Sequence, residues 1–186
     1  LDNSINSIAK NIIKDYQKKT NNKIFYKSEK KRGIVFARNA CLNFLKKKKP
    51  EYIGFIDDDC TLNQYWLINA FKIMRELKAD IVTGPQLYDK DVLANKRLNF
   101  SKFFEKNYKK ESLKVKWAAT NNVFFKFHAI KNNIKFDKNL NKFGMGEDQL
   151  FFSMLSKLGK KIYWSQKIQV TETIHYHRQN IKWLSN

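Results

Sequence analysis

The sequence contains little of several residue types, and each scarcity excludes a class of protein. Only two of its 186 residues are cysteine, Cys41 and Cys60. Cys41 falls on the apolar face of a predicted helix and Cys60 follows an acidic cluster, so we expect reduced thiols in a cytosolic protein and not a disulfide framework. No apolar run approaches the roughly 18 residues of a membrane-spanning helix, and no signal peptide is visible. We therefore expect a cytoplasmic location.

Acidic residues are scarce relative to basic ones, with 17 Asp and Glu against 37 Lys and Arg and a net charge of +20. Such a charge attracts polyanions, so nucleic acid, anionic lipid and phosphorylated sugars are candidate partners. All but five of the basic residues are lysine, spread over the whole sequence as a compositional bias would also produce. The one compact run, residues 46–49, closes a predicted helix, where cations complement the helix dipole. Peripheral contact with the anionic inner face of a membrane is the alternative.

The apolar content is sufficient for one folded domain. Hydrophobic residues make up 42% of the sequence and aromatic residues 15%, which excludes a disordered chain. No linker or internal repeat is visible, and the length suits one core better than two. We therefore expect a single domain over residues 1–186. The sequence opens with Leu and not Met, so we interpret it as a fragment or a processed piece.

Helical and extended patterns alternate along the first half of the sequence. Helices are expected at residues 5–16, 34–49 and 63–77, and strands at residues 23–27, 52–56 and 80–83. In the second half, strands are expected at residues 117–125, 161–164 and 168–171, and helices at residues 100–108 and 147–158. This alternation predicts an α/β fold, a Rossmann-like and mostly parallel sheet with helices on both faces.

Three consecutive carboxylates, Asp57, Asp58 and Asp59, end the predicted strand at 52–56. Such a cluster raises its own pKa values unless a cation or hydrogen-bond donors neutralise it. Mg²⁺ or Mn²⁺ shared with a phosphate would suit these oxygens, although one Asp could simply cap a helix while the others are solvated. Ligands of open α/β sheets bind beyond the carboxyl ends of strands, and Asp2 either lines the same crevice or is a surface residue.

A second acidic pair, Glu147 and Asp148, opens a predicted helix after Gly144 and Gly146. The helix dipole favours carboxylates there, so the pair either caps the helix or supplies a general base for a sugar hydroxyl.

Candidate cationic and imidazole ligands complete the set. His175 and His177 point the same way in an extended segment and are either metal ligands or structural residues. Arg178 could bind a diphosphate bidentately, and Arg38 either reaches a nucleotide phosphate or lies in solvent.

These elements, in this order, resemble family 2 glycosyltransferases with the GT-A fold. The motifs that carry the resemblance are Asp2-Asn3-Ser4, Arg32-Gly33-Ile34, Ala37-Arg38-Asn39-Ala40, Phe55-Ile56-Asp57-Asp58-Asp59, Thr120-Asn121-Asn122, Phe136-Asp137, Gly146-Glu147-Asp148 and Glu172 through Arg178 to Trp183-Leu184. They cover nearly the whole sequence. The first strand of the family is absent, so the resemblance implies an N-terminally truncated domain.

The resemblance implies an inverting enzyme that moves a sugar from a nucleotide-diphosphate sugar, with UDP expected first and GDP second, to a saccharide or lipid-linked hydroxyl acceptor in cell-surface polysaccharide or lipopolysaccharide synthesis. Residues 1–85 would bind the nucleotide sugar and residues 86–186 the acceptor. The implied site residues share four roles: Asp148 as base with Glu147 beside it; Asp2, Asp57 and Asp58 on the nucleotide; Asp59 with His175 or His177 on Mn²⁺ or Mg²⁺; and Arg178 on the leaving diphosphate.

Two other functions compete with this hypothesis. Asp57 and Asp59 also match a haloacid-dehalogenase-type phosphatase, in which the first Asp is the nucleophile and the second the acid/base. That fold places its motif on the first strand, and the two βα units expected before residue 52 count against it. A polyanion-binding module would use the net charge, but no nucleic-acid-binding motif is present.

Overall fold

A computed structural model covers the chain, and it describes residues 1–88, 110–130, 134–143 and 145–175. The chain divides into two compact units: unit 1 comprises residues 1–50 and 131–151, and unit 2 comprises residues 51–130 and 152–186. These units do not coincide with the two halves expected from the sequence, residues 1–85 for the nucleotide sugar and residues 86–186 for the acceptor. The binding roles of those halves stay a prediction. Each unit is described by itself.

Two helices form most of the first segment of unit 1. Helix α1 spans Ala9–Lys19, later than expected, and α2 spans Ile34–Lys48. Lys49 adopts a left-handed conformation, with φ of 47°, and its N–H donates to the carbonyl of Leu45 at 2.8 Å. This cap ends α2 immediately before Pro50, so the predicted end of the helix is confirmed.

The strand expected at residues 23–27 does not form in the described structure. Asp2 instead makes a single parallel bridge with Ser28, in which the Asp2 N–H donates to Lys27 and the Glu29 N–H donates to Asp2, both at 2.8 Å. One bridge is too short for a strand. The prediction of two βα units before residue 52 was therefore wrong.

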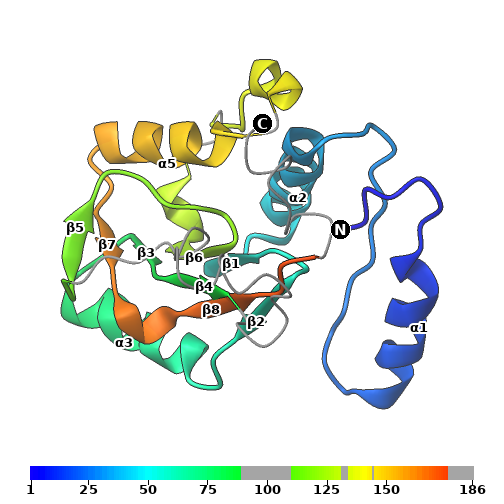
Figure 1. Cartoon of the computed structure of the whole chain (residues 1–186), viewed down its shortest axis with the longest axis horizontal. Helices are drawn as coiled ribbons and strands as arrows, with labels where there is room; N and C mark the ends of the chain where they lie inside the picture. Colours follow the sequence, from blue (N-terminus) through cyan, green and yellow to red (C-terminus); the bar gives the residue numbers. More distant parts are fainter. Residues whose placement is uncertain (89–109, 131–133, 144, 176–186) are drawn as a thin grey trace. The chain divides into compact units, whose positions relative to one another are not determined.

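Unit 2 contains a five-stranded sheet (Figure 1). In spatial order its strands are β1 (Tyr52–Ile56), β6 (Asn122–Lys126), β3 (Ile81–Thr83), β7 (Ile162–Trp164) and β5 (Leu113–Val115). Strands β1, β3 and β7 run in one direction, β6 runs antiparallel between β1 and β3, and β5 is antiparallel at the edge. The α/β class is confirmed, with mixed pairing in the sheet.

A second, three-stranded sheet belongs to the same unit. Its order is β2 (Cys60–Leu62), β8 (Val170–Glu172) and β4 (Gln86–Tyr88). Strand β8 is antiparallel to β2 and parallel to β4. Short 3₁₀ turns occupy Phe127–Ala129, Lys138–Lys142 and Gln166–Ile168.

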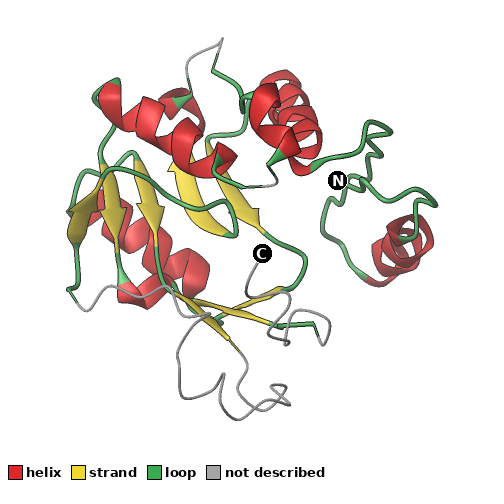
Figure 2. Cartoon of the chain, turned by 45° about the horizontal axis from the view of Figure 1, so that its top comes forward, coloured by secondary structure: helices red, strands yellow, loops and turns green. Residues whose placement is uncertain are grey.

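Helices cover both faces of the five-stranded sheet (Figure 2). Helix α3, Trp66–Glu76, packs on one face through Trp66, and α5, Glu147–Lys157, reaches the other through Phe152. Neighbouring residues of β6 serve the two faces: the Phe124 ring contacts Trp66 at 5.8 Å, and the Phe125 ring contacts Phe152 at 5.8 Å. Burial of each aromatic side chain contributes about 1.5–3 kcal/mol. The prediction of helices on both faces is confirmed.

Within the described ranges, no helix is both long and apolar enough to cross a bilayer. The helix expected at residues 100–108 lies outside the described residues.

Candidate functional site

The three consecutive aspartates form the turn between β1 and β2. Strand β1 ends at Ile56 and β2 begins at Cys60, whose N–H donates to the carbonyl of Asp57 at 3.2 Å. Asp57 and Asp59 are half-buried and Asp58 is exposed. The structure therefore confirms that the aspartates follow the carboxyl end of a strand.

Strand β8 brings a fourth carboxylate to this turn. Glu172 pairs with Cys60 across the two strands and is buried, and the N–H of Thr173 donates to the carbonyl of Asp59 at 2.8 Å. Burial, followed by the carboxylates of Asp59, Glu172 and Asp57, raises the pKa of Cys60 to about 12. Negative charge is therefore concentrated around the Cys60 thiol. Glu172 entered the sequence argument only through its place in a motif.

The same segment carries the predicted histidine ligands only in part. His175 is exposed, three residues beyond Glu172, whereas His177 and Arg178 lie outside the described residues. Among the residues that the structure describes, no three His, Cys, Asp or Glu side chains are grouped to hold a metal ion. The carboxylates of this turn are hard oxygen donors, which fits a divalent cation that shares its coordination with a phosphate. The metal roles of Asp59, His175 and His177 stay predictions.

The side chain of Asn122 holds the end of the five-stranded sheet that lies beside the acidic turn. It pairs with Ile56, the last residue of β1, and its side chain is buried. Its Oδ1 accepts from Trp66 Nε1 at 2.8 Å, and its Nδ2 donates to the carbonyls of Pro85 at 3.0 Å and Ile168 at 2.7 Å. One amide thus joins β6 to α3 and to two loops. The matched Thr120-Asn121-Asn122 motif therefore includes a structural residue.

A small cavity of about 20 Å³ lies at the same edge, at the carboxyl ends of β3 and β7. That volume suits one water molecule. Gln86 is buried, and its Oε1 has no hydrogen-bond partner among the described residues. A Cβ on Gly84 would lie 2.6 Å from the carbonyls of Ser165 and Ile168, so only glycine fits there. The cavity is also lined by Trp117 and Trp164; sequence reasoning missed these residues because they come from separate loops and strands.

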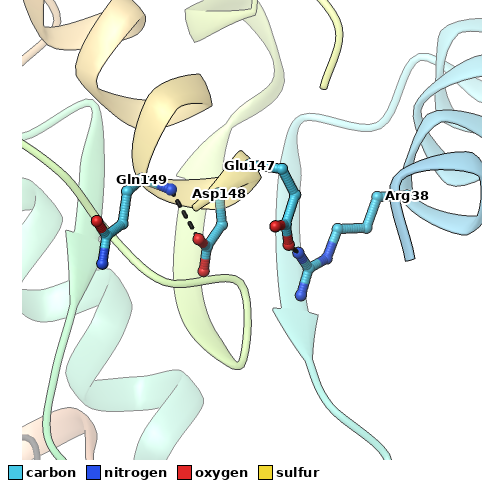
Figure 3. A network of polar contacts seen from close by, with 4 residues as sticks. All are labelled: Arg38, Glu147, Asp148 and Gln149. Atoms are coloured by element: carbon cyan, nitrogen blue, oxygen red, sulfur yellow. Dashed lines mark hydrogen bonds and ion pairs between the residues drawn. The ribbon is translucent and has the colours of Figure 1, made fainter. Parts of the chain in front are cut away.

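In unit 1, Arg38 and Glu147 form a buried ion pair (Figure 3). Arg38 lies on α2 and Glu147 is the first residue of α5. The guanidinium also lies 5.8 Å from the Phe136 ring centroid. Of the two expectations for Arg38, a position in solvent is wrong because the side chain is buried, and contact with a nucleotide phosphate stays a prediction. The catalytic role of Glu147 also stays a prediction.

Asn39, next to Arg38 on α2, binds the backbone of Phe136, where the segment that leads to Glu147 begins. Its Nδ2 donates to the carbonyl of Phe136 at 2.9 Å, and the Phe136 N–H donates to its Oδ1 at 3.0 Å. The Phe136 ring stacks on Phe151 of α5 at 4.2 Å. Two consecutive residues of α2 therefore hold the segment from Phe136 to Glu147.

Asp148 lies in the first turn of α5 and is half-buried. Gly146 has φ of 86°, which agrees with the expected sharp turn before this helix. The Asp148 carboxylate accepts from the N–H of Gln149 at 2.7 Å (Figure 3). The positive end of the helix dipole favours negative charge at this position.

Asp2 is a buried hydrogen-bond acceptor within unit 1. Its carboxylate accepts from the hydroxyl of Ser4 at 2.6 Å, the N–H of Ser4 at 2.8 Å, the hydroxyl of Tyr26 at 2.9 Å and the N–H of Ala9 at 3.3 Å. The Ser4 hydroxyl, then the Ser4 N–H, lower the pKa of Asp2 to about 2. Asp2 therefore anchors the entry to α1, and its predicted nucleotide contact stays untested.

Comparison with known proteins agrees with this architecture. The family described as glycosyl transferase family 2 matches residues 1–134. The chain belongs to this family. Succinoglycan biosynthesis protein ExoM of Rhizobium meliloti (strain 1021) is 26% identical over 154 residues, which cover 82% of this chain and 48% of ExoM. The chain thus spans about half the length of that relative.

Solved structures show the same fold. S. aureus TarS residues 1–349, crystallised with UDP-GlcNAc, superpose with a TM-score of 0.63 at 20% identity, over 89% of this chain and 46% of that one. A197 from STIV gives a TM-score of 0.55 at 19% identity, over 88% of this chain and 78% of that one. The predicted GT-A fold of this family 2 member is confirmed.

Proposed function

We propose that this family 2 glycosyltransferase is inverting and moves a sugar from a nucleotide-diphosphate sugar to a hydroxyl acceptor in cell-surface polysaccharide synthesis. The family supports sugar transfer, and the name of ExoM, a succinoglycan biosynthesis protein, supports the pathway class. The TarS complexes with UDP-GlcNAc and UDP support a nucleotide-sugar donor. The family also favours glycosyl transfer over the phosphatase alternative.

In the proposed reaction, the acceptor oxygen bonds to the anomeric carbon as the bond from that carbon to the diphosphate oxygen breaks. The Asp148 carboxylate takes the proton from the acceptor hydroxyl. Its place in the first turn of α5 supports this role, because the side chain is only half-buried there and can meet an acceptor hydroxyl. Glu147, paired with Arg38, orients that turn.

The acidic turn carries the donor side of the proposal. Asp57 and Asp58 would bind the nucleotide, and Asp59 would hold Mn²⁺ or Mg²⁺. Bound there, the cation would supply positive charge against the negative charge that develops on the departing diphosphate. Peripheral contact with an anionic membrane is part of the proposal, and the net charge of +20 supports it.

The single observation that carries the proposal is the grouping of Asp57, Asp59 and Glu172 at the end of β1, in a member of this family. Cys60 pairs with Glu172 across the strands, its N–H donates to the carbonyl of Asp57, and its thiol lies 3.8 Å from the Asp59 carboxylate. We would measure thermal stabilisation of the chain by UDP, GDP, CMP and dTDP, each with Mn²⁺, with Mg²⁺ and with a chelator. We expect stabilisation by one nucleotide only when a cation is present. Stabilisation by none of the four would overturn the donor assignment.

Two variants separate the proposed cation-binding role of Asp59 from the proposed base role of Asp148. Asp59→Asn should abolish the cation-dependent stabilisation. Asp148→Asn should retain it and lower sugar transfer by about 10²- to 10⁴-fold. Asp137→Asn is the matched control and should change neither quantity, because this residue is exposed and its carboxylate accepts from the N–H of Asn139 in its own turn.

A further inference from the structure

The outward face of α3 combines exposed apolar side chains with cations. At about 100° per residue, the buried side chains of α3 occupy one half of the helix, and these are Trp66, Ala70, Ile73 and Met74. Exposed apolar residues lie before and along the rest of the helix: Tyr65, which precedes α3, at 56%, Leu67 at 51%, Ile68 at 67% and Phe71 at 41% exposure. Because the buried half holds α3 on the sheet, Leu67 and Ile68 are left facing solvent. The Phe71 ring is partly exposed but also packs edge-on against the rings of Tyr52 at 4.8 Å and Phe124 at 5.0 Å.

Basic side chains follow toward the end of the helix. They are Lys72, Arg75 and Lys78, and Lys126 joins them from the end of β6. Together with Tyr52, Ile68, Phe71 and Met74, they line a groove of about 710 Å³. Of the described residues that line this groove, four are cations and none is a carboxylate. We call the exposed apolar residues and these cations the α3 surface.

We propose that the α3 surface docks the protein on an anionic membrane. Basic residues near an anionic bilayer each favour binding, and exposed apolar side chains insert between the headgroups. A soluble polyanion would require only the cations, so the exposed side chains of Tyr65, Leu67 and Ile68 favour a lipid surface. The inference rests on the proposed function in one respect, because it identifies the surface that makes the membrane contact proposed there.

The cationic groove of the α3 surface lies away from the acidic turn. Tyr52, at the start of β1, lines the groove, and Asp57 follows the end of the same strand. Five residues of strand separate the two by roughly 17 Å. The cationic groove therefore lies at the end of β1 opposite to Asp57, whereas the start of α3 lies nearer the acidic turn, because Trp66 bonds to Asn122 there.

Helix α1 is the rival surface, since Ile5, Ile8, Ile12 and Tyr16 are exposed beside its lysines. None of its residues is buried in the described structure. Its exposed apolar residues therefore do not identify an outward face, and nothing indicates what covers them. In α3, by contrast, the buried half shows which side of the helix faces away from the sheet.

The test is co-sedimentation with vesicles of phosphatidylcholine alone and with vesicles in which about a third of the lipid is phosphatidylglycerol. The charge variant is Lys72→Gln/Arg75→Gln/Lys78→Gln. Its matched control, Lys46→Gln/Lys47→Gln/Lys48→Gln, removes the same charge from α2, and a second control, Lys10→Gln/Lys14→Gln/Lys18→Gln, tests α1. Circular dichroism and thermal unfolding verify that each variant folds.

We expect wild type to bind the anionic vesicles preferentially. The charge variant should lose about a hundredfold in partitioning, at about fivefold for each basic residue, and neither control should lose more than about fivefold. No preference of wild type for anionic vesicles overturns the proposal, as does an equal loss in the charge variant and either control.

An apolar variant distinguishes a membrane from a soluble polyanion. Leu67→Asn/Ile68→Asn should weaken vesicle binding and leave binding to a heparin column unchanged. Unchanged vesicle binding would identify a site for soluble polyanions and overturn membrane docking. Failure of the nucleotide assignment appears separately, because Asp59→Asn should lose cation-dependent nucleotide binding and sediment with vesicles as wild type does.

Discussion

The guanidinium of Arg38 donates to the carboxylate of Glu147 across 109 positions of sequence, and both side chains are buried. This ion pair joins the second turn of α2 to the first residue of α5. Asp148 is the next residue along the chain. The pair therefore determines where the first turn of α5, and with it the proposed base, is placed within unit 1.

Removing one member of this pair should cost more than removing both. Arg38→Met or Glu147→Gln leaves the other charge buried without its partner, and we expect each to lower the free energy of unfolding by about 3–5 kcal/mol. Arg38→Met/Glu147→Leu removes both charges and should come within about 1 kcal/mol of wild type. Urea unfolding measures all three. Equal or additive losses would show that the residues do not stabilise unit 1 as a pair.

Replacing Asn122 should strongly lower the free energy of unfolding. Asn122→Leu leaves the Trp66 N–H and the carbonyls of Pro85 and Ile168 without their partner, so we expect a loss of about 2–5 kcal/mol in unfolding free energy. Asn69→Ala is the control, because that amide makes one exposed bond, to the carbonyl of Lys167 at 2.9 Å. It should cost at most about 1 kcal/mol. Similar losses in the two variants would refute the structural role of Asn122.

The contribution of Asp2 should disappear in acid. Its pKa is lowered from the ordinary 3.8 to about 2, so its ionised form stabilises the folded state above about pH 4, and this stabilisation is lost as the pH falls toward 2. Thermal unfolding of wild type and Asp2→Asn should therefore differ at pH 7 and converge at pH 2. Asp15→Asn is the control, because the ion pair that Asp15 makes with Lys18, at 3.5 Å, is exposed. A difference for Asp2→Asn that persists unchanged at pH 2 would contradict this origin.

Local patterns in the sequence were sufficient for the elements that form around the site. The apolar periodicity of α2 and α3, the apolar run of β1 and the glycines before α5 each act within a few residues, and the structure confirms them. The expected strand at 23–27 failed for the opposite reason. Strand propensity needs a partner, and in the described structure this segment finds a single bridge at Ser28.

The contacts that assemble the site are long-range and left no local signal. Strand β6 is inserted between β1 and β3 by pairing Asn122 with Ile56, and Arg38 meets Glu147 from another helix. Gln86 and Trp164 reach one cavity from different strands. The sequence pattern of a helix is the same whether a charged residue faces solvent or a buried partner. Periodicity alone therefore could not determine the surroundings of Arg38.

The thiol of Cys60 should be unusually unreactive. Both cysteines are free, as expected, and burial together with Asp59, Glu172 and Asp57 raises the pKa of Cys60 to about 12. At pH 8 the thiolate fraction would be about 10⁻⁴, against about a quarter for an ordinary cysteine. In a Cys41→Ser background, Cys60 should therefore react with a disulfide reagent at least about 10³-fold more slowly in the folded chain than in urea.

Two variants test the origin of this low reactivity. Asp59→Asn should accelerate the reaction, because it removes a neighbouring negative charge. Asp58→Asn, in an exposed residue that does not raise the pKa of Cys60, should not. Equal acceleration by the two variants would mean that the charge of Asp59 is not directed at Cys60.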